Sequence, residues 1–328
     1  MAGRSSYLLR LLFCSSIALL ASACGGGSSS DSGGSSGTSV PALLANYVGT
    51  WVASCTTDAP SVIYTLSINS SGQYWLLTRE YDSAANCGDD ANLANSQIST
   101  SVTATIEANT SNSQYNDFYL TNSEVRMTAH SASQVSSWIS SAQCDKTDWS
   151  VGSEAEFNAS SSGNGCFQTS TRAAMQLSGS TLLMNTRGGF DGGDPPDIVF
   201  TKQSASPLLT GKIGGTAWMV VSGKVSAGFD AGTLSYTLYD TYVPDICNTF
   251  YFSSRSVVLF SLPEATGSYS LGLSSNTVTL YDGSTNYIVT SGSVEIDTLT
   301  AGQAAGSMDA TYDSNNSVSG EFALTRCP

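Results

Sequence analysis

Hydrophobic and polar residues alternate with a period of two along most of the chain. In 61–69 every second residue is apolar, and a Ser-Ser-Gly turn at 70–72 leads into a second apolar run at 73–81. Alternation interrupted by turn residues is typical of β-strands with one buried face. The pattern continues in further segments of the first two thirds of the chain, which are 98–107, 117–129, 171–178, 180–187 and 197–203.

One segment has helical spacing instead. Its apolar residues fall at i, i+3, i+4 and i+7, and they are Val135, Trp138, Ile139 and Ala142. We predict a short amphipathic helix over 132–143 that begins at Ser131 or Ser133. Its apolar stripe must cover another element, most simply a sheet or the end of a barrel.

Strand-like segments also fill the chain after residue 206, separated by Gly, Asp-Gly and Asn-Asn turns. They are 217–225, 233–240, 249–253, 256–262, 268–273, 277–281, 286–290, 292–298, 307–312 and 318–325. A Ser-Ala-Ser-Pro run at 204–207 suggests a boundary, and short strands with regular turns indicate sandwiches or barrels. The predicted fold class is all-β, with two antiparallel domains that are barrels, sandwiches or one of each. We expect a β-barrel-like domain at 41–205, which contains the helix, and a β-sandwich-like domain at 206–328.

The N-terminal residues have the composition of a secretion signal. Arg4 and Arg10 precede an apolar stretch of about ten residues, and the segment ends Leu-Ala-Ser-Ala-Cys at 20–24 before a Gly/Ser run. The apolar stretch is too short for a membrane-spanning helix, which needs ~20 residues. No other apolar stretch approaches that length, so we expect no transmembrane helix.

The segment 20–24 resembles the lipobox of bacterial lipoproteins, in which small residues precede a Cys that is acylated. The resemblance implies a signal peptide at 1–23, lipid attachment at Cys24 and a lipidated tether at 24–40. In that family an Asp after the Cys retains the protein in the inner membrane, so Gly25 implies the outer membrane of a Gram-negative bacterium, on either face. The alternative is an ordinary Ala-Ser-Ala cleavage site that leaves a free thiol at Cys24.

The number of cysteines bears on this choice. Seven cysteines follow residue 23, and an odd number leaves one thiol unpaired in an oxidising compartment. Acylation of Cys24 would let the other six pair completely, and these are Cys55, Cys87, Cys144, Cys166, Cys247 and Cys327. We predict sequential disulfides because they keep each bridge within one domain. The C-x₂₋₄-C spacing of zinc sites is absent from the sequence.

The charge and the motifs exclude several classes of function. A net charge of −14 opposes binding to nucleic acid. The sequence has a single His and no nucleophile elbow, P-loop or dinucleotide fingerprint, so we predict no cofactor, no metal and no enzymatic activity. His130 could be a catalytic base or a ligand in a barrel, but a half-exposed polar position is the simpler interpretation. The acidic loop 191–197 and the pair Asp89-Asp90 could bind Ca²⁺, yet ordinary turns explain their composition.

The run Gly49-Thr50-Trp51, followed by about eight strands and a basic residue, resembles the lipocalin-type (calycin) barrels over roughly 45–203. The resemblance implies that Trp51 closes the barrel floor and that Lys202 or Arg187 stacks on it. The second domain is similar to β-domains of unknown function in bacterial lipoproteins, through 292–297 and 318–322, which implies no chemistry.

These observations leave three hypotheses for function. The first is a ligand-binding module of the cell envelope that holds a small apolar molecule or a glycan, motivated by Gly49 and Trp51. The second is a structural or adhesive surface lipoprotein without a small ligand, motivated by the polar, weakly charged composition and the tether. The third is an envelope hydrolase that uses His130 or an acidic pair. In each case the membrane is a partner through the lipid anchor.

Overall fold

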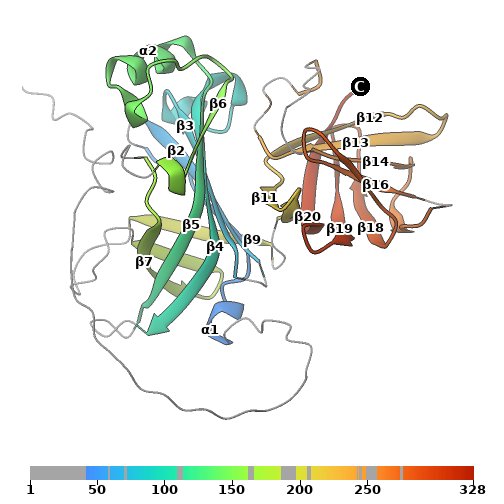
Figure 1. The fold of residues 1–328 in the computed structure, drawn as a ribbon, viewed down its shortest axis with the longest axis horizontal. Helices are drawn as coiled ribbons and strands as arrows, with labels where there is room; N and C mark the ends of the chain where they lie inside the picture. The colour runs from blue at the N-terminus through green and yellow to red at the C-terminus, as the bar shows by residue number, and fades with distance from the viewer. Residues whose placement is uncertain are drawn as a thin grey trace, which may run out of the picture.

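The structure is a computed structural model, and most of the chain after residue 41 is described. It covers 42–57, 60–69, 72–108, 114–161, 166–185, 197–204, 208–241, 243, 246–248, 257–273 and 276–328. The predictions for the signal peptide, Cys24, the tether, the strand at 249–253, Arg187 and the acidic loop up to residue 196 lie outside these residues. Most described elements are strands, arranged in two sheets (Figure 1), which confirms the predicted all-β class.

The first sheet closes into a barrel. Its strands are β1 (Gly49–Ala53), β2 (Ser61–Ile68), β3 (Tyr74–Tyr81), β4 (Leu93–Ala108), β5 (Asn116–Ala129), β6 (Glu154–Asn158), β7 (Ser170–Ser178), β8 (Thr181–Asn185) and β9 (Ile198–Ser204). The order β4-β3-β2-β1-β9-β8-β7-β5 returns to its start through an additional β4–β5 pairing, which gives a closed antiparallel barrel of eight strands. The ninth strand, β6, pairs only with β5.

The long strands β4 and β5 make this closure possible. The first half of β5, from Asn116 to Thr121, pairs with β7, and its second half, from Glu124 to Thr128, pairs with β6. Register shifts near Ser101 bend the β4–β5 hairpin between these halves. The sequence did not predict β6, which has Glu at two of its five positions. It also placed the start of β4 too late, because residues 95–97 are polar although they continue the strand.

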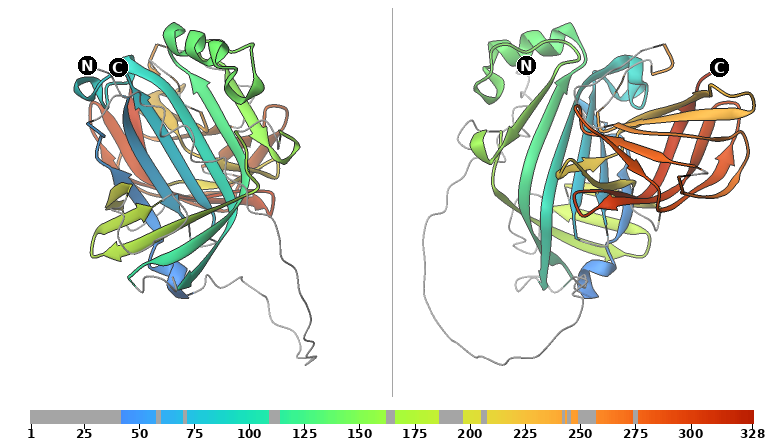
Figure 2. Two further views of the ribbon diagram at one scale, coloured as in Figure 1. Left: turned by 90° about the vertical axis from the view of Figure 1, so that its left-hand side faces the viewer. Right: turned by 45° about the vertical axis from the view of Figure 1, so that its right-hand side comes forward.

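Two helices lie at opposite ends of the barrel (Figure 2), with α1 (Ala42–Ala45) drawn blue and α2 (Ala132–Ser140) drawn green. The hydroxyl of Ser131 accepts a hydrogen bond from the backbone N of Gln134 at 3.2 Å, which identifies the N-cap. The helix ends earlier than predicted, since Ala142 and Cys144 have left-handed backbone conformations. Trp138 is buried as expected, but Ile139 is 40% exposed, so the apolar stripe is narrower than predicted. Short 3-10 turns complete the unit: η1 (Ala84–Asn86), η2 (Asp90–Asn92), η3 (Gln143–Asp145) and η4 (Ala159–Ser161).

The second sheet curls into a half-barrel rather than two separate sheets. Its strands are β10 (Thr210–Ile213), β11 (Thr216–Met219), β12 (Ser222–Ala227), β13 (Thr233–Tyr239), β14 (Val257–Pro263), β15 (Gly267–Ser270), β16 (Val278–Tyr281), β17 (Asn286–Val289), β18 (Gly292–Leu299), β19 (Gln303–Asp313) and β20 (Asn316–Arg326). Their main order is β15-β18-β19-β20-β12-β13-β14-β16-β17, and β10 pairs with β11 and β20. The single strand predicted at 217–225 is two strands, β11 and β12, and β10 was not predicted.

One pairing between named strands departs from the antiparallel pattern, in addition to the isolated parallel bridges Leu208–Glu321 and Leu271–Asn276. β12 and β20 run parallel, with Lys224 opposite Thr325 and Val225 opposite Arg326. The reason is topological: β20 leaves the β19–β20 hairpin and inserts beside β12, far from it in sequence. The concave face of the sheet carries one continuous apolar core, which includes Tyr236, Phe260 and Phe322.

The described cysteines form three disulfides with the predicted sequential pairing. Cys55 is joined to Cys87, Cys144 to Cys166 and Cys247 to Cys327. The first two lie in the barrel unit. The third links the segment after β13 to the residue that follows β20, across 80 positions of sequence.

Candidate functional site

The α1 end of the barrel is a packed apolar floor. Trp51 is almost fully buried, and its indole Nε1 donates a hydrogen bond to the backbone O of Tyr47 at 2.9 Å. Lys202 lies opposite Trp51 in the β1–β9 register, and its Nζ is 4.9 Å from the centroid of the indole. The structure therefore brings together Trp51 and Lys202, one of the two basic residues that the lipocalin resemblance offered as its partner. Phe118 packs edge-on against Tyr47 in the same floor.

The inner wall becomes polar further from this floor. Leu66 and Tyr74 belong to the apolar core of the barrel, so the strand alternation and the register also turn Tyr64, Thr78 and Gln97 inward. Tyr64 lies opposite Thr78, and Thr78 lies opposite Gln97. All three are half-buried, unlike the floor residues.

Ionisable groups extend the polar band that Tyr64, Thr78 and Gln97 form on the inner wall. Burial raises the pKa of Tyr64, and the charges of Glu80 and Asp197 raise it further. Ser99 follows Gln97 on the inner face of β4, and its hydroxyl accepts a hydrogen bond from Nε2 of Gln97 at 3.3 Å. The interior thus changes from an apolar floor to a wall that carries hydroxyl, amide and carboxylate groups.

A second apolar cluster covers the α2 end. Trp138 of α2 packs on Trp149 with ring centroids 4.5 Å apart, and Trp149 in turn lies near Phe157 of β6. The Cys144–Cys166 disulfide holds the loop that carries Trp149. The polar band therefore lies between two apolar regions that are packed independently.

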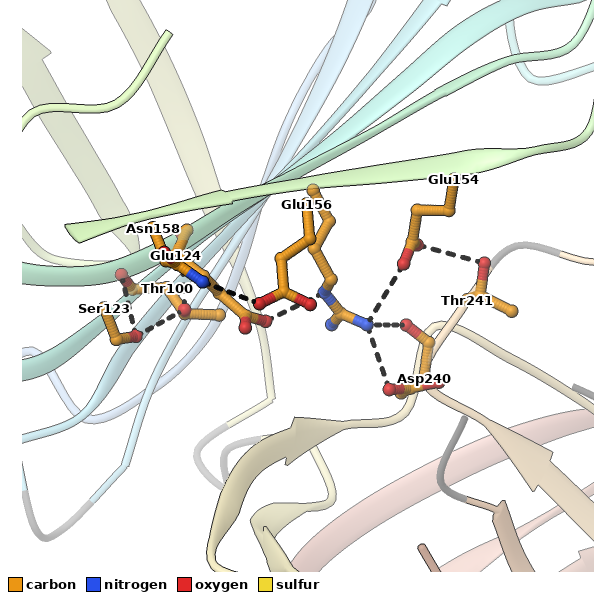
Figure 3. Close-up of polar contacts among 9 residues, drawn as sticks. Thr100, Ser123, Glu124, Glu154, Glu156, Asn158, Asp240 and Thr241 are labelled. Atoms are coloured by element: carbon orange, nitrogen blue, oxygen red, sulfur yellow. Dashed lines mark hydrogen bonds and ion pairs between the residues drawn. The ribbon is translucent and has the colours of Figure 1, made fainter. Parts of the chain in front are cut away.

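A buried arginine, Arg126, joins the barrel to the second sheet, and Figure 3 labels the carboxylate residues that surround it, Glu124, Glu154 and Asp240. Arg126 of β5 is 1% exposed, and its Nη1 donates hydrogen bonds to the backbone O of Asp240 at 2.9 Å and to Oδ2 of the same residue at 3.0 Å. Nε of Arg126 lies 3.0 Å from Oε1 of Glu124. Glu154 of β6 lies 3.9 Å from Nη1 and accepts a hydrogen bond from the hydroxyl of Thr241.

This joint, formed by Arg126, Glu124, Glu154 and Asp240, holds more negative than positive charge. The side chains of Glu124, Glu154 and Asp240 are each at most 9% exposed and surround one guanidinium. Burial lowers the pKa of Arg126, but the charges of these carboxylates outweigh burial and raise it overall. Charges that are removed from water need such partners, because an isolated buried ion is very costly.

An apolar contact lies beside this charged network. Trp75, Leu77 and Ile98 on the outer face of the barrel pack against Met219 of β11. The backbone N of Leu208 also donates to the hydroxyl of Ser67 at 3.2 Å. Polar and apolar contacts together attach the second sheet to the side of the barrel.

Sequence reasoning missed this joint. It interpreted His130 as a half-exposed polar position and assigned no role to Arg126, which lies four residues earlier on the same strand face. The structure buries Arg126 and Thr128, because the second sheet covers the face. One signal in the sequence could have indicated this joint. Glu124 and Arg126 share one face of a strand, in a chain with only 12% charged residues.

His130 follows directly after β5 and is half-buried. Its Nε2 lies 2.9 Å from the hydroxyl of Ser96, and burial lowers its pKa to about 4. It is therefore neutral at pH 7. Asp89 is similarly structural, since its carboxylate accepts hydrogen bonds from the backbone N of Ala91 and the side chain of Asn92.

Within the described ranges, no group of three or more His, Cys, Asp and Glu side chains is arranged to hold a metal ion. None of the described helices is long and apolar enough to cross a membrane. Neither the models of known protein families nor the curated proteins contain a match to this chain.

Proposed function

We propose that the chain is a lipid-anchored protein of the bacterial cell envelope whose barrel binds a small, largely apolar molecule with a polar group. The observation that supports binding is the graded inner wall of the barrel, apolar at Trp51 and polar from Tyr64 to Gln97. Ligand sites are mostly apolar with a few polar groups that fix orientation, and this wall offers both. Membership in a lipocalin-like family is part of the same proposal.

A filled interior would abolish such binding. Gln97→Trp places a large side chain on the inner wall, whereas Thr105→Trp places it on the exposed outer face of the same strand. The probe is 1-anilinonaphthalene-8-sulfonate, an apolar molecule with one anionic group, and its fluorescence is titrated against the folded protein. We expect Gln97→Trp to weaken binding at least about tenfold, the equivalent of ~1.4 kcal/mol. Thr105→Trp should bind like the wild type.

Both variants must keep the wild-type circular dichroism spectrum and unfolding midpoint, so that a change in probe binding does not come from unfolding. No saturable binding by the wild type would reject the proposal, and so would equal binding by both variants. The probe also binds loosely packed states, so the folded controls are measured in the same samples.

The lipid anchor has a separate test. The anchor is supported by the sequence at 20–24 alone, since these residues lie outside the described part of the chain. Intact-mass analysis of the protein from a bacterial membrane should show a mature chain that begins at an acylated Cys24. A mature chain with an unmodified Cys24, or one that begins elsewhere, would contradict this assignment.

A structural or adhesive role is the second candidate, and the joint at Arg126 favours it. Burial of Arg126 with Asp240 fixes the second sheet against the barrel, as a spacer or adhesive module requires. Deletion in the producing bacterium should then impair envelope integrity or surface attachment. If both stay unchanged while probe binding persists, the ligand-binding proposal is preferred.

A further inference from the structure

Phe229 is the most exposed large hydrophobic side chain among the described residues. It lies at the tip of the β12–β13 hairpin, which points away from the barrel (Figure 1), and its relative exposed fraction is 104%. Its two neighbours in sequence, Gly228 and Asp230, line a groove at the open mouth of the half-barrel, whereas Phe229 does not. A single exposed apolar residue is common on protein surfaces. The turn that carries Phe229 and the groove beside it distinguish this one.

The turn holds Phe229 in a fixed position. The backbone N of Gly228 donates a hydrogen bond to the backbone O of Thr233 at 2.9 Å, and the hydroxyl of Thr233 donates to the backbone O of Asp230 at 2.7 Å. A Cβ at Gly228 would lie 2.2 Å from the hydroxyl oxygen of Thr233, so this close approach needs a glycine. A side chain on such a preformed turn loses little conformational freedom when it binds.

The groove beside the turn has room for an aromatic ring. Its volume is about 680 Å³, and it lies between the β12–β13 turn, the end of β14, the β18–β19 turn and the end of β20. Leu234 and Leu299 contribute apolar walls, and Ala227, Ala231 and Ala301 keep the sides short. This volume is in the range of small-molecule sites, so one aromatic side chain fits within it.

The ring and the groove belong to one surface patch. Phe229 projects into solvent, while the residues before and after it form part of the groove wall. A patch that contains a projecting ring next to an apolar recess is complementary to a second copy of itself. A two-fold axis through the patch would place each ring opposite the groove of the other copy.

The charges around the patch favour a second copy over a lipid surface. Asp230 and Glu264 place carboxylates beside Phe229, and these oppose an anionic membrane. Arg326 forms an ion pair with Glu264, and its Nη1 donates to the backbone O of Thr300 at 3.2 Å. A guanidinium has five N–H donors, and the Arg326 side chain is 23% exposed, so it can also bind Asp230 of a second copy.

We propose that two copies of the chain associate through this patch, with Phe229 of each copy inserted into the groove of the other. Two aromatic rings of ~200 Å² each, with the groove surfaces that they cover, amount to about 800 Å². This area is smaller than the ~1,200 Å² of stable interfaces, so the dimer is weak and dissociates readily. The inference depends neither on ligand binding in the barrel nor on the lipid anchor.

Sedimentation velocity of the chain from residue 24 onwards tests the proposal. Every sample carries Cys24→Ser, so that no disulfide forms between copies, and is measured near 0.15 M salt to screen the net charge of −14. We expect a reversible dimer between about 5 µM and about 500 µM, and Phe229→Ser should weaken it at least about tenfold. Leu273→Ser is the matched control, because Leu273 is 87% exposed, does not line the groove and should leave the dimer unchanged.

A second variant separates the ring from the groove. Ala301→Trp fills the groove and keeps Phe229, so it should also weaken the dimer. A mixture of Phe229→Ser and Ala301→Trp should associate more strongly than either variant alone, because together they restore one ring and one groove. Each variant must keep the wild-type circular dichroism spectrum and unfolding midpoint.

Three results would overturn the proposal. The first is a wild-type protein that stays monomeric over the whole concentration range. The second is a dimer that Phe229→Ser leaves unchanged, or a mixture of the two variants that associates no better than its components. The third is binding of monomeric wild type, but not of Phe229→Ser, to phosphatidylcholine vesicles, which would assign the ring to a lipid surface.

Discussion

The two sheets are built from similar strands, but only the first one closes. β4 and β5 have 16 and 14 residues and pair along most of their length, which joins the two ends of the first sheet. The terminal strands of the second sheet, β15 and β17, have 4 residues each and pair with one neighbour only. A barrel needs strands long enough to tilt and stagger around its axis, and short strands end a sheet instead.

The difference determines where each unit can hold something. The closed barrel places polar side chains such as Gln97 inside, between a floor and a covered end. The open half-barrel has its accessible space at a mouth bordered by turns and by the Glu264–Arg326 pair. Four measurements test this difference between the two sheets.

Loss of the arginine at the joint should have the largest effect. Arg126→Met leaves the buried carboxylates of Glu124, Glu154 and Asp240 without their cation, and we expect a loss of about 5 kcal/mol in unfolding free energy. Urea unfolding should then show two transitions, one for each sheet. The control is Arg172→Met, whose ion pair with Asp117 is partly exposed and should contribute less than about 1 kcal/mol. Equal effects of the two variants would show that the buried network does not couple the units.

The disulfides should matter more for the open sheet than for the closed barrel. Cys247 and Cys327 are 80 positions apart, and removal of their bridge should cost about 4.5 kcal/mol in the chain-entropy model. Cys144 and Cys166 are 22 apart, for a cost of about 3.4 kcal/mol. Double Cys→Ser variants compared by urea unfolding test this order. The reverse order would mean that barrel closure depends on its own disulfide more than on β4–β5 pairing.

Acid should act selectively on the barrel through His130. Its pKa is lowered to about 4 in the folded state from an ordinary value of 6.5. As the pH falls from 6.5 towards 4, the unfolded chain gains a proton that the folded protein does not, so stability is lost in that window. We expect His130→Gln to reduce this loss by on the order of 2 kcal/mol. Identical pH profiles of wild type and variant would show that burial does not hold His130 neutral.

The cation at the floor should have the smallest effect. Lys202→Met removes the contact with the Trp51 ring and should lower the unfolding free energy by about 1 kcal/mol. Lys212→Met on β10 of the second sheet is the matched control and should change little. Tryptophan fluorescence during urea unfolding measures the unfolding free energy of both variants. A larger loss from Lys212→Met would contradict the role of Lys202 in the floor.

The sequence predicted the features that depend on local pattern. Strand alternation and the cap at Ser131 are encoded within a few residues, and the sequential cysteine pairing followed from the expected division into two domains. The buried position of Arg126 depends on Asp240, which lies 114 residues away, and no local pattern indicates that contact. The same holds for the groove, because Leu234, Glu264 and Arg326 meet only after the sheet has curled.

The parallel pairing of β12 with β20 has a consequence for biogenesis. β20, the most C-terminal strand, contacts β10, β12 and β19 and therefore lies in the middle of its sheet. The earlier strands β12 to β14 can form a meander, but they cannot join β18 and β19 until residues 316–326 have been delivered. Synthesis on the ribosome proceeds along the chain from its N-terminus, so the barrel can fold while the half-barrel still lacks its central strand. A chaperone or protease would encounter the half-barrel in this unfinished state.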